Sequence, residues 1–182
     1  MRCKTFVAQS VMLAATMVLV SGCGGGSSSA GKPSEVRSVS TDDPSVVVGD
    51  DVDLTVDFSF STDTVVHDNH NVTIVVKLPR GLAFQPETAR IDEIGGTDKV
   101  TPSIEFCADG TTYLRFDLGQ NVLANASDAA GGADGSLIMA IAGSEAVGAV
   151  SIEAAAGYDF EVVLGSCAQP LAPQDTAPFT VL

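Results

Sequence analysis

The feature that most constrains the fold is a strict two-residue alternation of apolar and polar side chains that begins near residue 51. Acidic and hydroxyl residues separate the apolar positions Val52, Leu54, Val56, Phe58 and Phe60. Because successive side chains of a strand point to opposite faces, this pattern predicts a half-buried strand with an acidic outer face.

Similar runs follow along the chain. Residues 72–78 alternate and stop at Pro79, and residues 112–118 are joined to residues 104–108 by Asp109-Gly110, a typical hairpin turn. Runs at 137–142, 147–156, 158–164 and 179–182 complete the set, and no long stretch shows a helical period. Short strands separated by turns predict an all-β fold, an immunoglobulin-like β-sandwich of about seven to nine strands.

The N-terminus has the features of an export signal. Arg2 and Lys4 precede a run from residue 11 to residue 20 in which Thr16 is the only polar residue, a run too short to span a bilayer. The sequence Val20-Ser21-Gly22-Cys23 that follows resembles the lipobox of bacterial lipoproteins. An ordinary secretory signal with a chance cysteine is the alternative.

The lipobox resemblance implies that residues 1–22 are a lipoprotein signal peptide and that Cys23 carries diacylglycerol and a third acyl chain such as palmitate. Anchoring by more than one chain is stable, so the partner at this end is the membrane itself. Gly24, rather than Asp, after the cysteine implies the outer membrane in a diderm cell, and a monoderm cell would display the protein on its plasma membrane. Residues 23–43, rich in Gly and Ser at their start, are predicted to be a tether, and residues 44–182 a single domain.

Loss of residues 1–22 would leave 160 residues with seven Lys and Arg against 23 Asp and Glu, a net charge of −16. Such a surface repels phosphate backbones, so nucleic acid is not an expected partner.

The remaining cysteines form a pair. Cleavage removes Cys3 and lipid occupies Cys23, which leaves Cys107 and Cys167, and a lone pair in an exported protein predicts a disulfide. Cys107 shares its strand phase with Glu105 rather than with Ile104 and Phe106, so the disulfide is expected at the end or outer face of the sandwich. A redox-active dithiol is the alternative, but the Cys-x-x-Cys spacing is absent.

Two elements carry a family resemblance. Gly49-Asp50 precedes the first long strand, and Leu78-Pro79-Arg80-Gly81-Leu82-Ala83-Phe84 follows the next. Over residues 44–165 the chain resembles the conserved repeat domain of bacterial surface proteins, a domain of unknown function. The resemblance implies an adhesive or spacer role and provides no catalytic residues.

Metal-binding candidates are few. His67 and His70 could supply two zinc ligands. Asp128 and Asp134, in the long connection 119–136, could supply calcium ligands, as could Asp50, Asp51 and Asp53. None of these three sets has a complete ligand spacing, and polar loops explain them. No nucleophile or acid–base motif was found, so no cofactor and no enzymatic activity are expected.

These features predict a lipid-anchored envelope protein with a non-catalytic interaction or spacer domain and an envelope or surface protein as partner. The alternative is a calcium-dependent or small-ligand-binding lipoprotein of the periplasm or surface.

Overall fold

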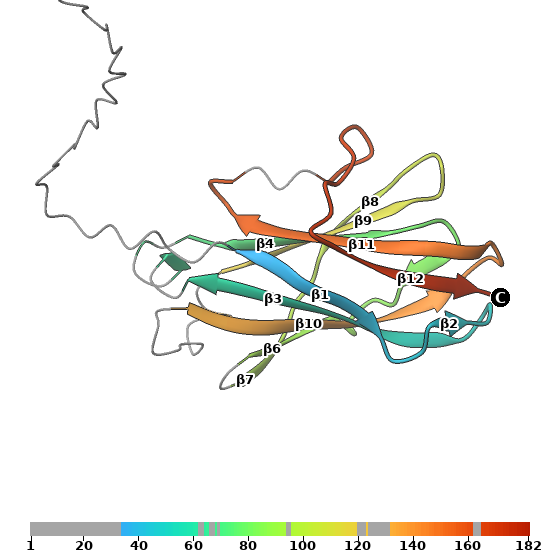
Figure 1. Cartoon of the computed structure of the whole chain (residues 1–182), viewed down its shortest axis with the longest axis horizontal. Coiled ribbons are helices and arrows are strands. Elements are labelled where there is room, and N and C mark those ends of the chain that lie inside the picture. The colour runs from blue at the N-terminus through green and yellow to red at the C-terminus, as the bar shows by residue number, and fades with distance from the viewer. Residues whose placement is uncertain are drawn as a thin grey trace, which may run out of the picture.

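A computed structural model describes residues 34–61, 64–65, 68, 70–93, 96–119, 123, 132–161 and 165–182. Within them the chain forms two six-stranded β-sheets that pack face to face (Figure 1). In the described part of the chain, no helix is long and apolar enough to cross a membrane.

The first sheet has the order β1-β3-β10-β6-β7, and β5 also pairs with β10. Its strands are β1 (Glu35–Thr41), β3 (Asp51–Ser61), β5 (Leu82–Phe84), β6 (Arg90–Glu93), β7 (Gly96–Lys99) and β10 (Gly132–Gly143). The second sheet has the order β2-β12-β11-β4-β9-β8. Its strands are β2 (Ser45–Val46), β4 (Val72–Leu78), β8 (Ser103–Phe106), β9 (Thr112–Leu118), β11 (Gly148–Tyr158) and β12 (Asp175–Val181).

The strand order has the immunoglobulin-like pattern. The run β1-β3-β10-β6 corresponds to strands A-B-E-D of that fold, and β12-β11-β4 corresponds to G-F-C. The predicted sandwich is therefore confirmed. The described residues form twelve strands rather than seven to nine, because short strands such as β2 and β5 are too brief to show a period.

The core lies between the sheets and follows the alternation seen in the sequence. Leu54, Val56, Phe58 and Phe60 of β3 are all fully buried. Gly135 of β10 lies directly opposite Phe58, and a Cβ atom at Gly135 would come within 2.8 Å of the Phe58 Cζ atom. A glycine is thus needed there to leave room for the aromatic ring.

Two sequence predictions of local structure were wrong. Residues 35–41, assigned to the tether, form β1 and pair with β3, so the sandwich begins before residue 44. A β-bulge between Val36 and Ser38 places Val36 and Val39 three apart although both are buried, which hides the two-residue period.

The strand predicted over residues 158–164 also differs. Tyr158 is the last residue of β11, and a turn follows at residues 159–160. Residues 162–164 lie outside the described residues.

Side chains near the C-terminus hold β1 against the second sheet. Gln174 Oε1 accepts hydrogen bonds from the backbone N–H groups of Val36, at 2.7 Å, and Ala156, at 2.9 Å. Asp175 Oδ2 accepts another from Val39 N–H at 2.7 Å. Gln174, just before β12, and Asp175, its first residue, thus satisfy backbone N–H donors of β1 and β11.

The chain enters and leaves the described sandwich at opposite ends. Glu35 pairs with Ser59 at the end of β3, whereas Val181 pairs with Gly148 at the start of β11. Figure 1 shows the N-terminal side of β1 at the left and the C-terminus at the right.

Candidate functional site

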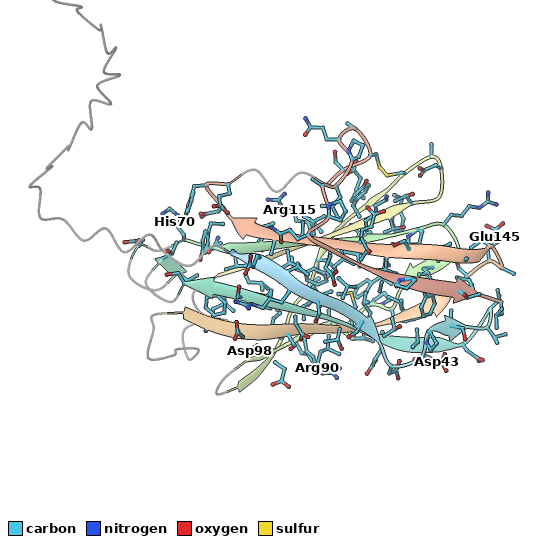
Figure 2. All side chains as sticks on the ribbon, in the orientation of Figure 1. Asp43, His70, Arg90, Asp98, Arg115 and Glu145 are labelled. Carbon is cyan, nitrogen blue, oxygen red and sulfur yellow. A yellow bond between two sulfur atoms is a disulfide. The ribbon has the colours of Figure 1, made fainter. Side chains whose placement is uncertain are left out.

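The cysteine pair is joined as predicted. Cys107 and Cys167 form a disulfide with their Cα atoms 5.4 Å apart, visible as the yellow bond in Figure 2. The hairpin beside it is also confirmed, since Cys107 N–H donates to Thr111 C=O at 2.8 Å and Gly110 has φ 86°. The disulfide therefore ties the end of β8 to the segment between β11 and β12.

A small second core lies beside the disulfide on the outer face of the second sheet. Val75, Tyr113, Ala155 and Leu171 are buried there, and Cys107 packs against them. The expectation that the disulfide lies on the outer face is confirmed. Val75 belongs to β4 and Ala155 to β11. On these two paired strands, Lys77 Nζ lies 2.9 Å from Glu153 Oε1.

The predicted histidine pair is described only in part, because His67 lies outside the described residues. His70 Nδ1 lies 2.8 Å from Asp159 Oδ1, and its ring meets the Phe160 ring edge-on at 4.7 Å. Desolvation alone would raise the pKa of Asp159, but hydrogen bonds from the Asn71 backbone and from His70 outweigh it and lower that pKa. His70 thus has a carboxylate partner and an aromatic one.

The tyrosine beside this cluster helps to close the same end of the sandwich. Tyr158 stacks on Phe160, with ring centroids 5.3 Å apart, and its hydroxyl oxygen accepts the Ser61 N–H at 2.7 Å. Burial raises the pKa of Tyr158, which keeps the phenol neutral across the ordinary pH range.

Of the predicted calcium ligands, Asp128 lies outside the described residues and Asp134 is exposed on β10. Asp134 Oδ1 lies 3.6 Å from Arg37 Nε, beside an open hollow that Asp57 and Asp92 also line. Both carboxylate oxygens of Asp57 already accept hydroxyl bonds at 2.6 Å, one from Ser38 and one from Ser136.

The acidic residues at the start of β3 show a similar arrangement. Asp53 Oδ2 lies 3.9 Å from Arg90 Nη2, so a cation of the protein itself faces that carboxylate. Among the described residues no group of three or more His, Cys, Asp or Glu is arranged to hold a metal ion.

A different surface stands out on β8, which forms one edge of the second sheet. β8 pairs with β9 on one side, and no described strand pairs with its other side. Ile104 is 42% exposed and Phe106 is 78% exposed. The sequence pattern placed both side chains in the core, and that expectation was wrong.

Their exposure follows from the position of β8. Ile104 lies opposite the fully buried Leu114 of β9, so the two side chains share the inner face of the sheet. Instead of facing the middle of the opposing sheet, Ile104 and Phe106 border an apolar hollow of about 400 Å³ that Leu82, Phe84 and Pro86 also line. We call this hollow the inner groove.

A second hollow lies on the other side of β8. It measures about 200 Å³ and lies over β8 and β9, lined by Ser103, Ile104, Glu105, Tyr113, Arg115 and Gly165. We call it the outer groove. The edge strand therefore runs between an apolar groove and a more polar one, each open to solvent.

Sequence reasoning missed this surface. The sequence shows that Ile104 and Phe106 share a face but contains no sign that β8 is the last strand of its sheet. The proximity of β5 to β8 likewise depends on the packing of one sheet on the other. The one usable signal was the shortness of the run before Asp109-Gly110, which is common at sheet edges.

Comparisons with known proteins leave the family open. No protein-family model matches the chain, and no curated protein matches it. Among solved structures, it is similar to a fragment of the major pilin GBS80 of Streptococcus agalactiae, with 12% identity and a TM-score of 0.46 over 83% of this chain and 53% of that one. The chain is also similar to the pilus backbone protein RrgB of Streptococcus pneumoniae, with 16% identity and a TM-score of 0.47 over 70% of this chain and 31% of that one.

The major pilin subunit BcpA of Bacillus cereus gives 9% identity and a TM-score of 0.49, over 82% of this chain and 40% of that one. The chain thus spans about half or less of the length of these three structures. At this level of identity and overlap, the similarities assign no function to the chain.

Proposed function

We propose that the chain is a lipid-anchored protein of the bacterial cell envelope whose sandwich is a non-catalytic interaction or spacer domain. The observation that carries the proposal is the Cys107–Cys167 disulfide, whose Cys107 packs against the second core. Disulfides persist in oxidising compartments, so this bond supports export of the domain from the cytoplasm. Export is also what the charged and apolar N-terminus indicates.

Anchoring at Cys23 supplies the second part of the proposal. The lipobox-like Val20-Ser21-Gly22-Cys23 is followed by a Gly- and Ser-rich stretch at residues 24–33. Since β1 begins at Glu35, the tether is shorter than the sequence indicated, and a flexible chain of that length has a root-mean-square span of about 17 Å. The domain would stand close to its membrane.

Metabolic labelling tests the anchor. Radiolabelled palmitate is expected on the wild-type protein and not on the Cys23→Ala variant. Cys3→Ala is the matched control, because it also removes a cysteine from the N-terminal region but leaves the lipobox-like sequence intact. Equal labelling of Cys23→Ala and wild type would refute the anchor.

Cell fractionation addresses the location. In a diderm host, Gly24 after the cysteine favours the outer-membrane fraction. Recovery of the wild-type protein in the soluble periplasmic fraction would contradict the proposal.

The second candidate function is calcium or small-ligand binding. The observation that favours a small ligand is the open hollow bordered by Asp57, Asp92, Asp134 and Arg37, while no described group of carboxylates is arranged as a metal site. A calcium concentration a hundredfold above the dissociation constant would stabilise the fold by about 2.7 kcal/mol. Thermal melts with calcium and with a chelator should differ if this function is correct, and coincident melts would exclude calcium.

A further inference from the structure

Among the described residues, no strand pairs with the outer edge of β8, so backbone groups of β8 face that open side. Cys107 N–H donates to Thr111 C=O, so the backbone of Cys107 faces β9. Hydrogen-bonding direction alternates along an antiparallel strand, so Glu105 and Ser103 face β9 as well. Ile104 and Phe106 therefore turn their N–H and C=O groups toward the open side, where an added strand could pair with them.

The inner groove matches the side-chain period of such a strand. Successive residues of a strand point to opposite faces. A strand added beside β8 would place every second side chain in the inner groove, against Ile104, Phe106 and Phe84, and the intervening ones on the outer face of the sheet, next to Glu105. The edge thus selects an extended segment with apolar residues at alternate positions.

The chain's own tether does not fit this description. Residues 24–33 contain Gly, Ser, one Ala, one Lys and one Pro, and none of these has a large apolar side chain. They cannot fill the inner groove.

A second copy of the chain is disfavoured by charge. Each mature copy would have a net charge of −16 and would bring its own Glu105 to the shared edge. Like charges placed opposite one another in a sheet are destabilising, and two strongly acidic domains repel.

The charges around β8 favour a basic occupant instead. Glu105 lies on the strand and Asp109 in its hairpin turn, where hydrogen bonds from Thr111 lower the pKa of Asp109 and keep it ionised. The nearby cations already face carboxylates: Arg115 Nε lies 3.3 Å from Asp117, and Arg80 Nε lies 2.9 Å from Glu145. A partner strand with Lys or Arg between its apolar residues would complement this edge.

We propose that the open edge of β8 binds an extended segment of a partner protein, with apolar residues at alternate positions and basic residues between them, as an added antiparallel or parallel strand. This inference rests on the proposed role as an interaction domain and specifies its partner. Backbone pairing provides affinity in this kind of recognition, and the pockets for alternate side chains provide specificity.

Binding can be measured on the chain as the cell processes it, purified in a neutral detergent. The probe is a fluorescent ten-residue peptide with Val, Ile or Phe at every second position and Lys or Thr between them. A second peptide has the same composition with the apolar residues grouped together. Fluorescence anisotropy should show saturable binding of the alternating peptide and at least tenfold weaker binding of the grouped one.

Variants of β8 test the contact. Ile104→Pro and Phe106→Pro each remove an N–H that faces the open edge and leave the bonds to β9 in place, so they should weaken binding at least tenfold. Phe106→Ser keeps the backbone donor and should weaken binding by loss of the inner-groove contact. Phe160→Ser is the matched control, because Phe160 is 59% exposed at the other end of the sandwich and its loss should not change binding.

The outcomes separate the explanations. Unchanged thermal melts of the proline variants would show that loss of binding is not loss of fold. Failure of the alternating peptide to bind, equal binding of the grouped peptide, or full binding by both proline variants would overturn the proposal. Sedimentation that shows a dimer dissociated by Phe106→Pro would assign the edge to a second copy instead. Palmitate labelling does not depend on β8, so failure of this proposal is distinguishable from failure of the anchor.

Discussion

β3 and β8 show the same alternation of apolar and polar residues, yet they differ in burial. In β3 the alternate positions Val56 and Phe58 are fully buried, whereas in β8 Ile104 and Phe106 are 42% and 78% exposed. β3 has a neighbouring strand on each side, β1 and β10, whereas among the described strands β8 pairs with β9 alone. Alternation therefore specifies which face a side chain occupies, while the neighbouring strands and the opposing sheet determine how deeply it is buried.

The contrast holds within a single cross-strand pair. Leu114 and Ile104 lie opposite one another on the same face, but Leu114 is fully buried and Ile104 is not. β9 lies between β4 and β8, one strand farther from the edge. One position across a sheet thus separates a core residue from a surface residue.

The largest expected effect on the free energy of unfolding comes from β3, the buried strand. Phe58→Ala should lower the free energy of unfolding by about 3–5 kcal/mol, because it removes a fully buried ring and leaves a cavity. Urea denaturation of wild type and variant measures the change. A loss below about 1 kcal/mol would mean that β3 does not anchor the core as its burial indicates.

The disulfide comes next, because it holds the end of β8 in place. Replacement of both cysteines, Cys107→Ser with Cys167→Ser, should lower the free energy of unfolding by about 2–4 kcal/mol, mainly by freeing the unfolded chain. Hydrogen exchange should accelerate most in the β8–β9 hairpin. Equal acceleration in β3 and β10 would show that the bond supports the whole sandwich rather than this edge.

A smaller effect on the free energy of unfolding is expected from a change at Gly135, which lies opposite Phe58. Gly135→Ala brings a Cβ atom within 2.8 Å of the Phe58 ring and should cost about 1–3 kcal/mol by overpacking. Combination with Phe58→Leu should relieve part of that cost, so the two changes should not be additive. Strict additivity in urea denaturation would contradict direct contact between these positions.

The smallest effect is expected on the exposed strand. Phe106→Ser should change the free energy of unfolding by no more than about 0.5 kcal/mol, because most of the side chain is already in contact with water. A thermal melt within one or two degrees of wild type would agree. A loss comparable to that of Phe58→Ala would show that β8 is covered and that the proposed binding edge is not free.

Much of the fold could be predicted from the sequence because local patterns determine it. The strands β3, β4 and β9 keep apolar residues at every second position, although Val75 and Tyr113 are also apolar and buried, and Asp109-Gly110 marks the β8–β9 hairpin. The disulfide could be predicted because Cys107 and Cys167 were the only cysteines left after the N-terminal ones were assigned. In contrast, β1 was missed because its bulge shifts the period between Val36 and Ser38.

Most of the candidate site could not be predicted from the sequence. The inner groove brings Leu82 and Phe84 of β5 to Ile104 and Phe106 of β8, and these strands belong to different sheets. The contact between them depends on sheet packing, which a local pattern does not encode. The acidic and histidine candidates were chosen by residue type alone, and His70, Asp53 and Asp134 lie beside ordinary protein partners.

The opposite placement of residue 34 and the β8 hairpin has a mechanical consequence. Phe106 pairs with Thr112, which pairs with Leu78 at the end of the sandwich away from Glu35 (Figure 1). In a chain held at residue 34 and pulled at that far end, tension runs parallel to the strands. The hydrogen bonds between β1 and β3 are then loaded in shear, so all of them resist the sliding of one strand past the other at the same time. They do not break one after another from one end.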